Sequence, residues 1–589
     1  MTNKKGRQEG KTRGISRFRV GVLFGILIQS LLIVSVALAQ ELDWARQDGG
    51  PGSDTVAGIA IDKHGNSYVT GDFYNSITFG AGEENKTTLT PEGQQDLYVA
   101  SYRSDGVFRW ARKDGVSGIL NACDIAVEKD GNSYVTGTFS GEITFGVGED
   151  TETTFGSIGS RGIFVASYDK DGGFLWAAHA DGSSNSQYYG IAVDSSGNSY
   201  ITGPFKNTLT FGTGDHEIIL NSYGSTDIYR AAFNQDGDLL WAYQDSGESW
   251  EEGVDIAVDR DGNSYIIGVF DSTVTFGING PKQEIRTSSI NGEIFIAKYD
   301  TDGGLLWVEQ AGGSSSILGV AIDLDSENNV YVTGDYEYKA IFDAGGPNEF
   351  SLPFASLHQA FVASYTSNGN FRWATRVGGF TSTGTGITIS EVGDNYVAGI
   401  FQEVAIFGEG EDREKTIESF GYLDIFIAVY DKHGLFLGVQ QDGGLSEDFV
   451  AGITVDKFEN SYATGTFRGE ATFGQGTANE FTFTASGWND IFLTKYQWRL
   501  HQERIEAIID DLLLLIEDGE LTPGQGHALI AQLEAAVQSL DQQNYEAAVG
   551  QLSAFINAIE AAVQSGKLDP VLGQSLISDV QSIINSLEV

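Results

Sequence analysis

The chain of 589 residues has 81 acidic side chains against 35 basic ones, a formal net charge of −46, and 76 glycines but only 8 prolines. This acidity argues against nucleic acid as a partner, because binding phosphates needs a basic surface. One cysteine excludes a disulfide scaffold and a cysteine-based zinc cluster, and an apolar fraction of 41% excludes a disordered acidic chain.

The amino terminus has the pattern of a secretory signal peptide. Residues 1–19 carry seven basic side chains and one acidic one, and the apolar run Val20–Ala39 ends in Ala37-Leu38-Ala39. This order predicts cleavage after residue 39 and a secreted or cell-surface protein without a membrane span. An uncleaved anchor is the alternative, since about 20 apolar residues can cross a bilayer. The single Cys123 fits an exported protein that does not depend on disulfides.

One motif recurs seven times through most of the chain. The string GNSYVTG stands at Gly65–Gly71 and at Gly131–Gly137, and related strings follow five more times. Consecutive tyrosines of the motif lie 65 or 66 residues apart, at Tyr68, Tyr134, Tyr200, Tyr265, Tyr331, Tyr396 and Tyr462. So constant a period predicts seven copies of one structural unit.

A tryptophan repeats with the same period. It stands at Trp44, Trp110, Trp176, Trp241, Trp307 and Trp373, and the seventh slot is Gly438. We interpret these tryptophans as core residues, because large aromatic side chains dominate buried cores. The glycine at position 438, together with weaker motif copies in repeats five and six, predicts looser packing in the sixth repeat.

Each repeat has the pattern of several short strands. In the first copy these are GIAID (58–62), NSYVTG (66–71), a TFG stretch (78–80), DLYVASY (96–102) and VFRWA (107–111). Alternating β-branched and aromatic residues between Gly, Asp and Asn turns are typical of antiparallel strands and hairpins. A unit of this size suits one blade of a β-propeller, and seven blades fall within the usual range.

The two ends of the repeat region predict how the ring closes. A Trp strand at Leu42–Arg46 precedes the first copy, whereas the last copy stops at Asp490–Tyr496 with no Trp strand after it. We therefore expect the amino-terminal strand to complete the seventh blade, which removes an open edge. The predicted fold is mainly β: a seven-bladed β-propeller over residues 40–496, followed by a small α-helical bundle over residues 497–589.

The repeat resembles the SBBP-type bacterial β-propeller repeat. The resemblance rests on GIAVDxxGNSYVTG followed by DIFVASYDxDGxxLWA, and it covers about residues 42–496. It implies an extracytoplasmic seven-bladed propeller and no common enzymatic activity.

After residue 496 helical spacing replaces strand alternation. Apolar periodicity predicts helices over Leu500–Glu517, from Pro523, after a cap at Asn544, and from Pro570. Short joins between them favour an antiparallel bundle. Residues 505–589 resemble the FIMAH domain, chiefly through NYEAAVGQLSAFINAI at Asn544–Ile559. The resemblance brings no established chemistry, and the position of the segment implies an accessory docking role.

Catalytic signatures are missing from the sequence: it contains no GxSxG, HExxH, Walker or CxxC motif. None of the histidines recurs at a repeat position (His64, His179, His216, His358, His433, His501 and His527). His64 and His433 stand in DKHG turns, where we expect solvent-facing side chains. Histidines of different blades could still converge at the centre of a propeller.

Two turns place oxygens at alternate positions, as calcium requires: DRDGNS (Asp259, Asp261, Asn263) and DKDGG (Asp169, Asp171). Both depart from a calcium loop, since position six is Ser264 in the first and position twelve is Ala180 in the second. Asp, Asn and Gly are also ordinary hairpin-turn residues. We therefore assign no metal, cofactor or catalytic residue.

Acidic loops after the TFG stretch vary most between copies, as at 82–85, 148–150 and 410–414. They are either a ligand-facing rim or, as we prefer, a solvated surface that keeps the chain soluble. The sequence thus predicts a non-enzymatic scaffold that binds an extracellular protein or glycan. The alternatives are an enzyme, lyase or glycosidase, acting on an extracellular polysaccharide, and a structural component of an envelope or matrix. Several acidic or basic side chains converging at the centre would favour the enzyme.

Overall fold

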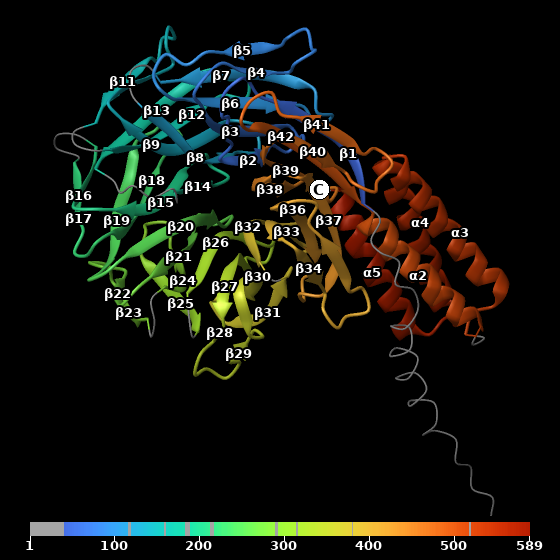
Figure 1. Cartoon of the computed structure of the whole chain (residues 1–589). Coiled ribbons are helices and arrows are strands. Elements are labelled where there is room, and N and C mark those ends of the chain that lie inside the picture. The colour runs from blue at the N-terminus through green and yellow to red at the C-terminus, as the bar shows by residue number, and fades with distance from the viewer. Residues whose placement is uncertain are drawn as a thin grey trace, which may run out of the picture. The chain divides into compact units, whose positions relative to one another are not determined.

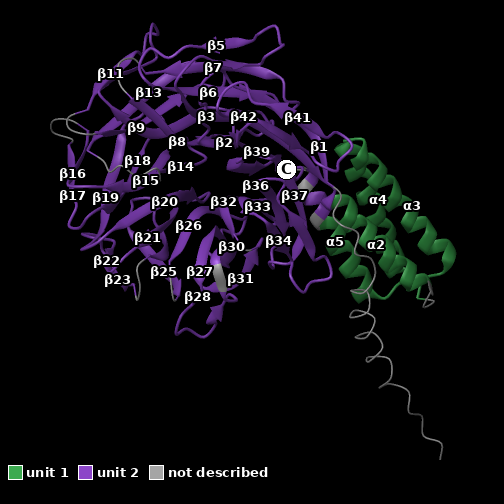
Figure 2. Cartoon of the chain, viewed as in Figure 1, with its two compact units in different colours: residues 1–37, 501–581 green, residues 38–500, 582–589 purple. Residues whose placement is uncertain are grey.

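The computed structural model describes residues 40–115, 119–157, 161–182, 189–212, 217–288, 292–313, 316–379, 381–517 and 520–588. Two compact units, coloured separately in Figure 2, hold the strands of residues 40–498 and the helices of residues 501–581. The signal peptide predicted at residues 1–39 lies outside the described residues.

Seven blades, each with four antiparallel strands, form the propeller and confirm the predicted architecture. Figure 1 shows them arranged around one axis. The innermost strands of neighbouring blades contact each other around the ring. From the inside outwards, the first three blades are β2 (Gly58–Ile61), β3 (Ser67–Phe73), β6 (Asp96–Tyr102) and β7 (Phe108–Asp114); β8 (Ile119–Val127), β9 (Ser133–Ser140), β12 (Gly162–Tyr168) and β13 (Phe174–Asp181); β14 (Gly190–Val193), β15 (Ser199–Phe205), β18 (Asp227–Phe233) and β19 (Leu239–Gly247).

The remaining blades follow the same order. They are β20 (Glu251–Val258), β21 (Ser264–Phe270), β24 (Glu293–Tyr299) and β25 (Leu305–Gly313); β26 (Ile317–Leu324), β27 (Val330–Tyr338), β30 (Ala355–Tyr365) and β31 (Phe371–Val377); β32 (Thr381–Ile389), β33 (Asn395–Gln402), β36 (Asp424–Tyr430) and β37 (Phe436–Gly444); β38 (Phe449–Val455), β39 (Asn460–Phe467), β42 (Asp490–Trp498) and β1 (Gln40–Asp48).

Strand β1 closes the ring as the sequence predicts. It pairs antiparallel with β42, from Gln40 opposite Trp498 to Asp48 opposite Ile491. The outermost strand of the last blade therefore comes from the opposite end of the repeat region. Strand β42 runs to Trp498, two residues past the boundary expected at residue 496.

The TFG stretch of each repeat forms one arm of a small hairpin, which the strand pattern alone did not predict. Four of these hairpins extend the outermost strand of the preceding blade, because β16 pairs with β13, β22 with β19, β28 with β25 and β40 with β37. One repeat thus ties two blades together at the circumference. The hairpins are β4–β5 (77–79 and 87–89), β10–β11 (142–145 and 153–156), β16–β17 (208–211 and 218–221), β22–β23 (273–276 and 284–287), β28–β29 (340–342 and 350–351), β34–β35 (404–407 and 415–418) and β40–β41 (470–473 and 481–484).

A buried carboxylate secures the hairpin where the ring closes. Asp48 of β1 accepts hydrogen bonds from the Gly80 amide, at 2.9 Å, and from the Tyr102 hydroxyl, at 2.5 Å. Burial raises the pKa of Asp48 to about 6, against the opposing effect of these two donors. Asp245 and Asp442 hold the corresponding glycine and tyrosine at two further junctions.

The repeated tryptophan joins its own blade to the next. Trp110 packs edge-on against Tyr68, with ring centroids 6.1 Å apart, and its indole N–H donates to the Lys170 carbonyl of blade two at 3.1 Å. Gly172 of that turn has φ +87°, and a Cβ there would lie 2.8 Å from the indole ring. Glycine therefore meets both the backbone conformation and the close approach of the tryptophan.

Blade six lacks this tryptophan, but the expected loosening is wrong. Trp498, at the end of β42, packs edge-on against Tyr396 with ring centroids 6.1 Å apart, the separation found in the other blades. Its indole N–H donates to the Ser461 hydroxyl at 2.9 Å, and the residue is 3% exposed. An indole from blade seven thus fills the slot that Gly438 leaves open.

Four helices follow the propeller strands: α2 (Leu500–Glu517), α3 (Pro523–Asp541), α4 (Tyr545–Gln564) and α5 (Pro570–Glu588). Proline begins α3 and α5, and the Asn544 side chain caps α4 by accepting from the Ala547 amide. The residues at which the four helices begin confirm the helix starts predicted from the sequence. Among the described residues, the helices are too short or too polar for a membrane crossing.

Replacing Trp498 with alanine should lower the free energy of unfolding by about 3–5 kcal/mol, as for other buried aromatic residues, because it empties the blade six slot. Trp488, which is 65% exposed, is the matched control, and its replacement by alanine should change stability far less. Chemical denaturation of both variants makes the comparison. Equal losses would contradict the role given to Trp498.

Candidate functional site

Three aspartates gather on the innermost strands around the axis. Asp124 of β8 accepts hydrogen bonds from the amides of Ile125, at 2.8 Å, and of Ile191 in the next blade, at 3.0 Å. Asp255 of β20 and Asp323 of β26 bridge to their next blades in the same way. Each carboxylate therefore positions two innermost strands.

Burial shifts the protonation of these axial carboxylates. It raises the pKa of Asp255, and the charge of Asp124 and then, more weakly, that of Asp323 raise it further. Burial also raises the pKa of Asp124, and it raises that of Asp323 to about 6. Asp255 is thus within electrostatic reach of the other two carboxylates, and all three have raised pKa values, so these side chains are able to exchange protons with their surroundings near neutral pH.

The turns considered for calcium are held by their own hydrogen bonds. Asp259 accepts from the amides of Asp261 and Asn263 and from the Tyr265 hydroxyl, and the Lys298 ammonium lies 3.3 Å from its carboxylate. These donors occupy the oxygens that a cation would need. The described residues contain no group of three or more His, Cys, Asp or Glu side chains arranged to hold a metal ion.

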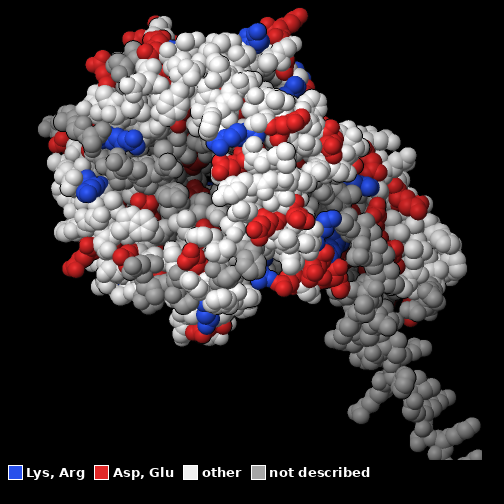
Figure 3. Space-filling model, in the orientation of Figure 1, with Lys and Arg blue, Asp and Glu red and all other residues white. Residues whose placement is uncertain are grey.

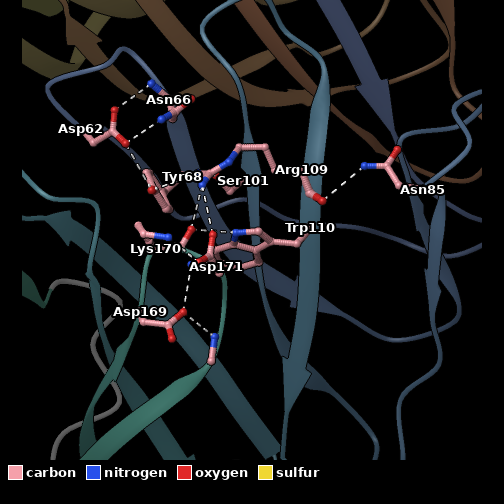
Figure 4. A network of polar contacts seen from close by, with 11 residues as sticks. Asp62, Asn66, Tyr68, Asn85, Ser101, Arg109, Trp110, Asp169, Lys170 and Asp171 are labelled. Carbon is pink, nitrogen blue, oxygen red and sulfur yellow. Dashed lines mark hydrogen bonds and ion pairs between the residues drawn. The ribbon is translucent and has the colours of Figure 1, made fainter.

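Figure 4 shows the same kind of turn where blades one and two meet. The Asp62 carboxylate accepts from the Asn66 amide group at 2.7 Å, and Arg109 donates to the Tyr68 hydroxyl, at 3.0 Å, and to the Lys170 carbonyl, at 2.9 Å. The network fixes the turns of adjacent blades. We therefore assign these side chains to the framework.

Histidines lie apart from the axial carboxylates. His64 and His433 are exposed in their turns, as predicted, and His179 stacks on Phe155. His358 of blade five lies between two carboxylates, 2.6 Å from Asp335 and 3.1 Å from Glu337. His501 and His527 belong to the helices, and His216 lies outside the described residues.

The variable acidic loops are the turns of the outer hairpins. Glu83 accepts from the Phe108 amide at 3.1 Å, and Asn85 donates to the Phe108 carbonyl at 2.7 Å. Glu149 and Glu411 hold the corresponding amides of blades two and six. These side chains fasten the start of an outermost strand, so part of each loop is structural.

Exposed apolar side chains gather in loops that join the strands of blades six and seven. Figure 3 shows acidic groups scattered over the face that it presents. Tyr422 is 55% exposed, Leu445 84% and Trp488 65%, and Phe420 is also exposed. Together with Arg468 we call these residues the aromatic loop surface.

Backbone and side-chain contacts make this surface continuous. A parallel bridge joins Leu423, beside Tyr422, to Glu447. Arg468 then pairs with Glu447 at 3.0 Å, and its guanidinium lies 4.5 Å from the centre of the Trp488 ring. Such stacking fixes the arginine and leaves a mixed aromatic and cationic surface.

This surface was not predicted from the sequence, because only the acidic loops after the TFG stretch were considered for recognition. A usable signal was present, since aromatic residues stand in SFGYLD (419–424), ASGWND (485–490) and NSYGSTD (221–227). Large aromatic side chains in Gly-containing loops on a rigid scaffold indicate recognition more often than folding.

Comparisons with known proteins agree with the architecture. Residues 43–72 match the SBBP β-propeller repeat, and residues 505–585 match the FIMAH domain. An uncharacterised WD repeat-containing protein of Acanthamoeba polyphaga mimivirus is 22% identical over 505 residues, which are 72% of this chain and 36% of that protein. The chain thus spans about a third of that relative.

Two solved structures also resemble the chain, at low similarity. The β-propeller domain of the Trilobed protease from Pyrococcus furiosus has a TM-score of 0.34 at 10% identity, and the match covers 75% of this chain and 93% of that one. A member of the duf4221 family from Bacteroides vulgatus has a TM-score of 0.27 at 8% identity, over 65% of this chain and 94% of that one.

Stability of the propeller should fall as the pH rises from about 4 to about 8. The pKa of Asp72 is raised to about 7 by burial, and burial also raises the pKa values of Asp124 and Asp255. Above pH ~4 the unfolded chain releases these protons while the folded chain keeps them, at a cost of about 1.4 kcal/mol per pKa unit. Denaturant titrations across this range measure the slope, and stability that rises with pH would contradict this assignment.

Proposed function

We propose that this chain is a secreted or cell-surface β-propeller scaffold that binds a protein partner and catalyses no reaction. The observation that carries the proposal is the aromatic loop surface. Tyrosine, tryptophan and leucine side chains lie exposed on adjacent loops of a rigid ring, beside a partly buried arginine. Exposed apolar clusters of this kind mark interaction sites in soluble proteins.

The composition of the surface favours a protein over a glycan. Protein interfaces are enriched in Trp, Tyr and Arg at the positions that contribute most binding energy. Leu445 offers a purely apolar contact, and the polar groups of Arg468 and Glu447 are engaged with each other rather than open to sugar hydroxyls. The experiment must therefore distinguish a protein partner from a glycan partner.

The propeller supports such binding by holding its loops on a ring that is closed by β1. Loops on a rigid scaffold lose little conformational entropy on binding. Secretion follows from the signal peptide predicted at residues 1–39 and would bring the surface into contact with extracellular partners.

A binding assay with a surface variant tests the proposal. The full chain is immobilised and exposed to cell-surface extracts of the producing cells, either untreated, treated with protease or treated with glycosidases. The variant Tyr422→Ser/Leu445→Ser/Trp488→Ser should lose at least about tenfold in affinity, as expected when central aromatic contacts are removed.

A control variant carries Ile219→Ser, Ile285→Ser and Val404→Ser, which change exposed residues of the outer hairpins. It should bind like the unmodified chain. Protease treatment of the extract should abolish binding, whereas loss on glycosidase treatment alone would identify a glycan instead. Equal binding by the surface variant and the control would contradict the proposed site.

The axial carboxylates favour one second candidate, an enzyme that acts on an extracellular polysaccharide. Asp124 and Asp255 have raised pKa values, as general acids require. Incubation of the chain with a panel of polysaccharides tests this function through product release. If the chain releases product and the folded variant Asp255→Asn does not, the chain is an enzyme. Binding without turnover would support the scaffold.

A further inference from the structure

Two acidic residues meet at three of the seven junctions between blades. One begins the third strand of a blade, and the other stands in the segment that leads to the next blade. The pairs are Asp490 with Asp54, Asp227 with Glu251, and Asp424 with Asp448. In each pair the amide of the second acid donates to the carbonyl of the residue before the first, at 3.4, 3.1 and 3.0 Å respectively. All six residues are at most 1% exposed, so the charges would lie out of water.

The acid pairs hold the loops of the aromatic loop surface. Asp424 accepts from the Phe420 amide at 2.8 Å, and Asp448 from the Gly444 amide at 2.7 Å, next to Leu445. Asp490 accepts from the Ser486 amide at 2.9 Å, two residues before Trp488. At the third junction Asp227 holds the amide of Tyr223, which is 76% exposed.

Each pair also has a carboxyl oxygen that lacks a donor. Among the described residues no hydrogen-bond donor reaches Oδ1 of Asp54, Asp227 or Asp424. The amides of Ser249 and Gly247 approach the Glu251 carboxyl but make no hydrogen bond of good geometry with it. At Gly443 a Cβ would lie 2.9 Å from Oδ1 of Asp424 and 3.1 Å from Oδ2 of Asp448. The two acids of this pair therefore converge on the same point.

A buried oxygen without a donor is costly, and two neighbouring buried carboxylates also repel each other. One proton removes both costs, because the protonated acid donates a hydrogen bond to its partner. We propose that each of the three acid pairs shares one proton, and that release of this proton opens the aromatic loops and so regulates the aromatic loop surface. The regulatory part rests on the function proposed above.

The surroundings of the pairs keep the proton bound near neutral pH. Burial raises the pKa of Asp54 to about 7, assisted by Asp490 and opposed by the Gly50 amide. Burial raises that of Glu251 to about 8, and the Asp227 charge adds to the effect while the amides of Ser249 and Gly247 oppose it.

At the third pair, burial raises the pKa of Asp448 to about 7. The amides of Arg468 and Gly444 oppose the effect, and the charges of Asp424 and Asp442 add to it. The guanidinium of Arg468 turns to Glu447 instead. The charged groups that act on these three carboxyls are thus acidic. When the shared proton is lost in alkaline solution, none of these groups supplies a positive charge in its place.

Junctions without a second acid provide the contrast. Asp96 begins the third strand of blade one, but the residue in the corresponding position of the next segment is Leu120, whose amide bonds to the Gln95 carbonyl. Lys113 lies 3.7 Å from the Asp96 carboxylate. This junction lacks the second buried acid, and it has a cation nearby that Glu92 shares. Oδ1 of Asp96 also lacks a donor among the described residues, but the charge of Lys113 offsets that of the carboxylate, so the junction should not open as protons are released.

Hydrogen exchange of the full chain, followed by mass spectrometry from about pH 6 to about pH 9, tests the proposal without any partner. After correction for intrinsic exchange, segments 443–449 and 486–490 should lose protection about tenfold for each pH unit above the pair's pKa. The variant Asp54→Asn/Glu251→Gln/Asp424→Asn supplies amide donors in place of the protons. Its loops should stay protected at every pH.

The control Asp96→Asn should keep the pH response of the unmodified chain in these segments. Protection that is independent of pH in the unmodified chain, or an equal loss in the triple variant, would overturn the proposal. If the triple variant folds poorly, as thermal unfolding at pH ~6 would reveal, the pH series on the unmodified chain and on Asp424→Asn alone decides. A positive result together with no partner binding would reject the proposed function and leave the shared protons in place.

Discussion

Contact between neighbouring blades is the constraint on which the whole structure depends. Each blade is a sheet of four strands that cannot bury both faces alone, so every face must be matched by the next blade. The chain meets this need with three kinds of contact, which occur in different combinations at the junctions: an indole to a turn carbonyl, a carboxylate to an amide, and a hairpin paired with the preceding blade. Closure by β1 completes the set, because it supplies blade seven with Trp44 and Asp48.

The seven junctions differ in chemistry although they share one geometry. Where the residue four places after the tryptophan position is an aspartate, a buried tyrosine hydroxyl has an acceptor; these residues are Asp48, Asp245 and, after Gly438, Asp442. Where that residue is Ala180, the tyrosine position is Phe233 and needs none. The match is incomplete: at two further junctions, where that residue is Ala311 or Val377, the buried hydroxyls of Tyr365 and Tyr430 have no hydrogen-bond partner among the described residues. The acid pairs pose the same problem for ionisable groups, because a buried carboxyl group needs a hydrogen-bond donor or a proton. These pairs lie beneath the loops with exposed aromatic residues.

Much of the fold could be predicted because it depends on local, periodic features. The tyrosine and tryptophan periods gave the number of blades, and the unmatched strand at residues 42–46 gave the closure. The role of Trp498 escaped prediction, because it stands outside the repeat period and its partner, Tyr396, is about a hundred residues away. The acid pairs escaped for the same reason. Each joins residues of two repeats, and neither Asp424 nor Asp448 differs in sequence from an ordinary turn acid. The aromatic loop surface had a sequence signal but needed the fold to bring Tyr422, Leu445 and Trp488 together.

Protons buried at the three acid pairs are proposed to hold the loops of the aromatic loop surface in place. Infrared difference spectroscopy tests this proposal most directly, because a protonated carboxyl group has a C=O stretch that an ionised one lacks. We expect the unmodified chain at neutral pH to show such a band, and part of it to disappear in Asp54→Asn/Glu251→Gln/Asp424→Asn. Identical carboxyl bands in the unmodified chain and the triple variant would contradict the account.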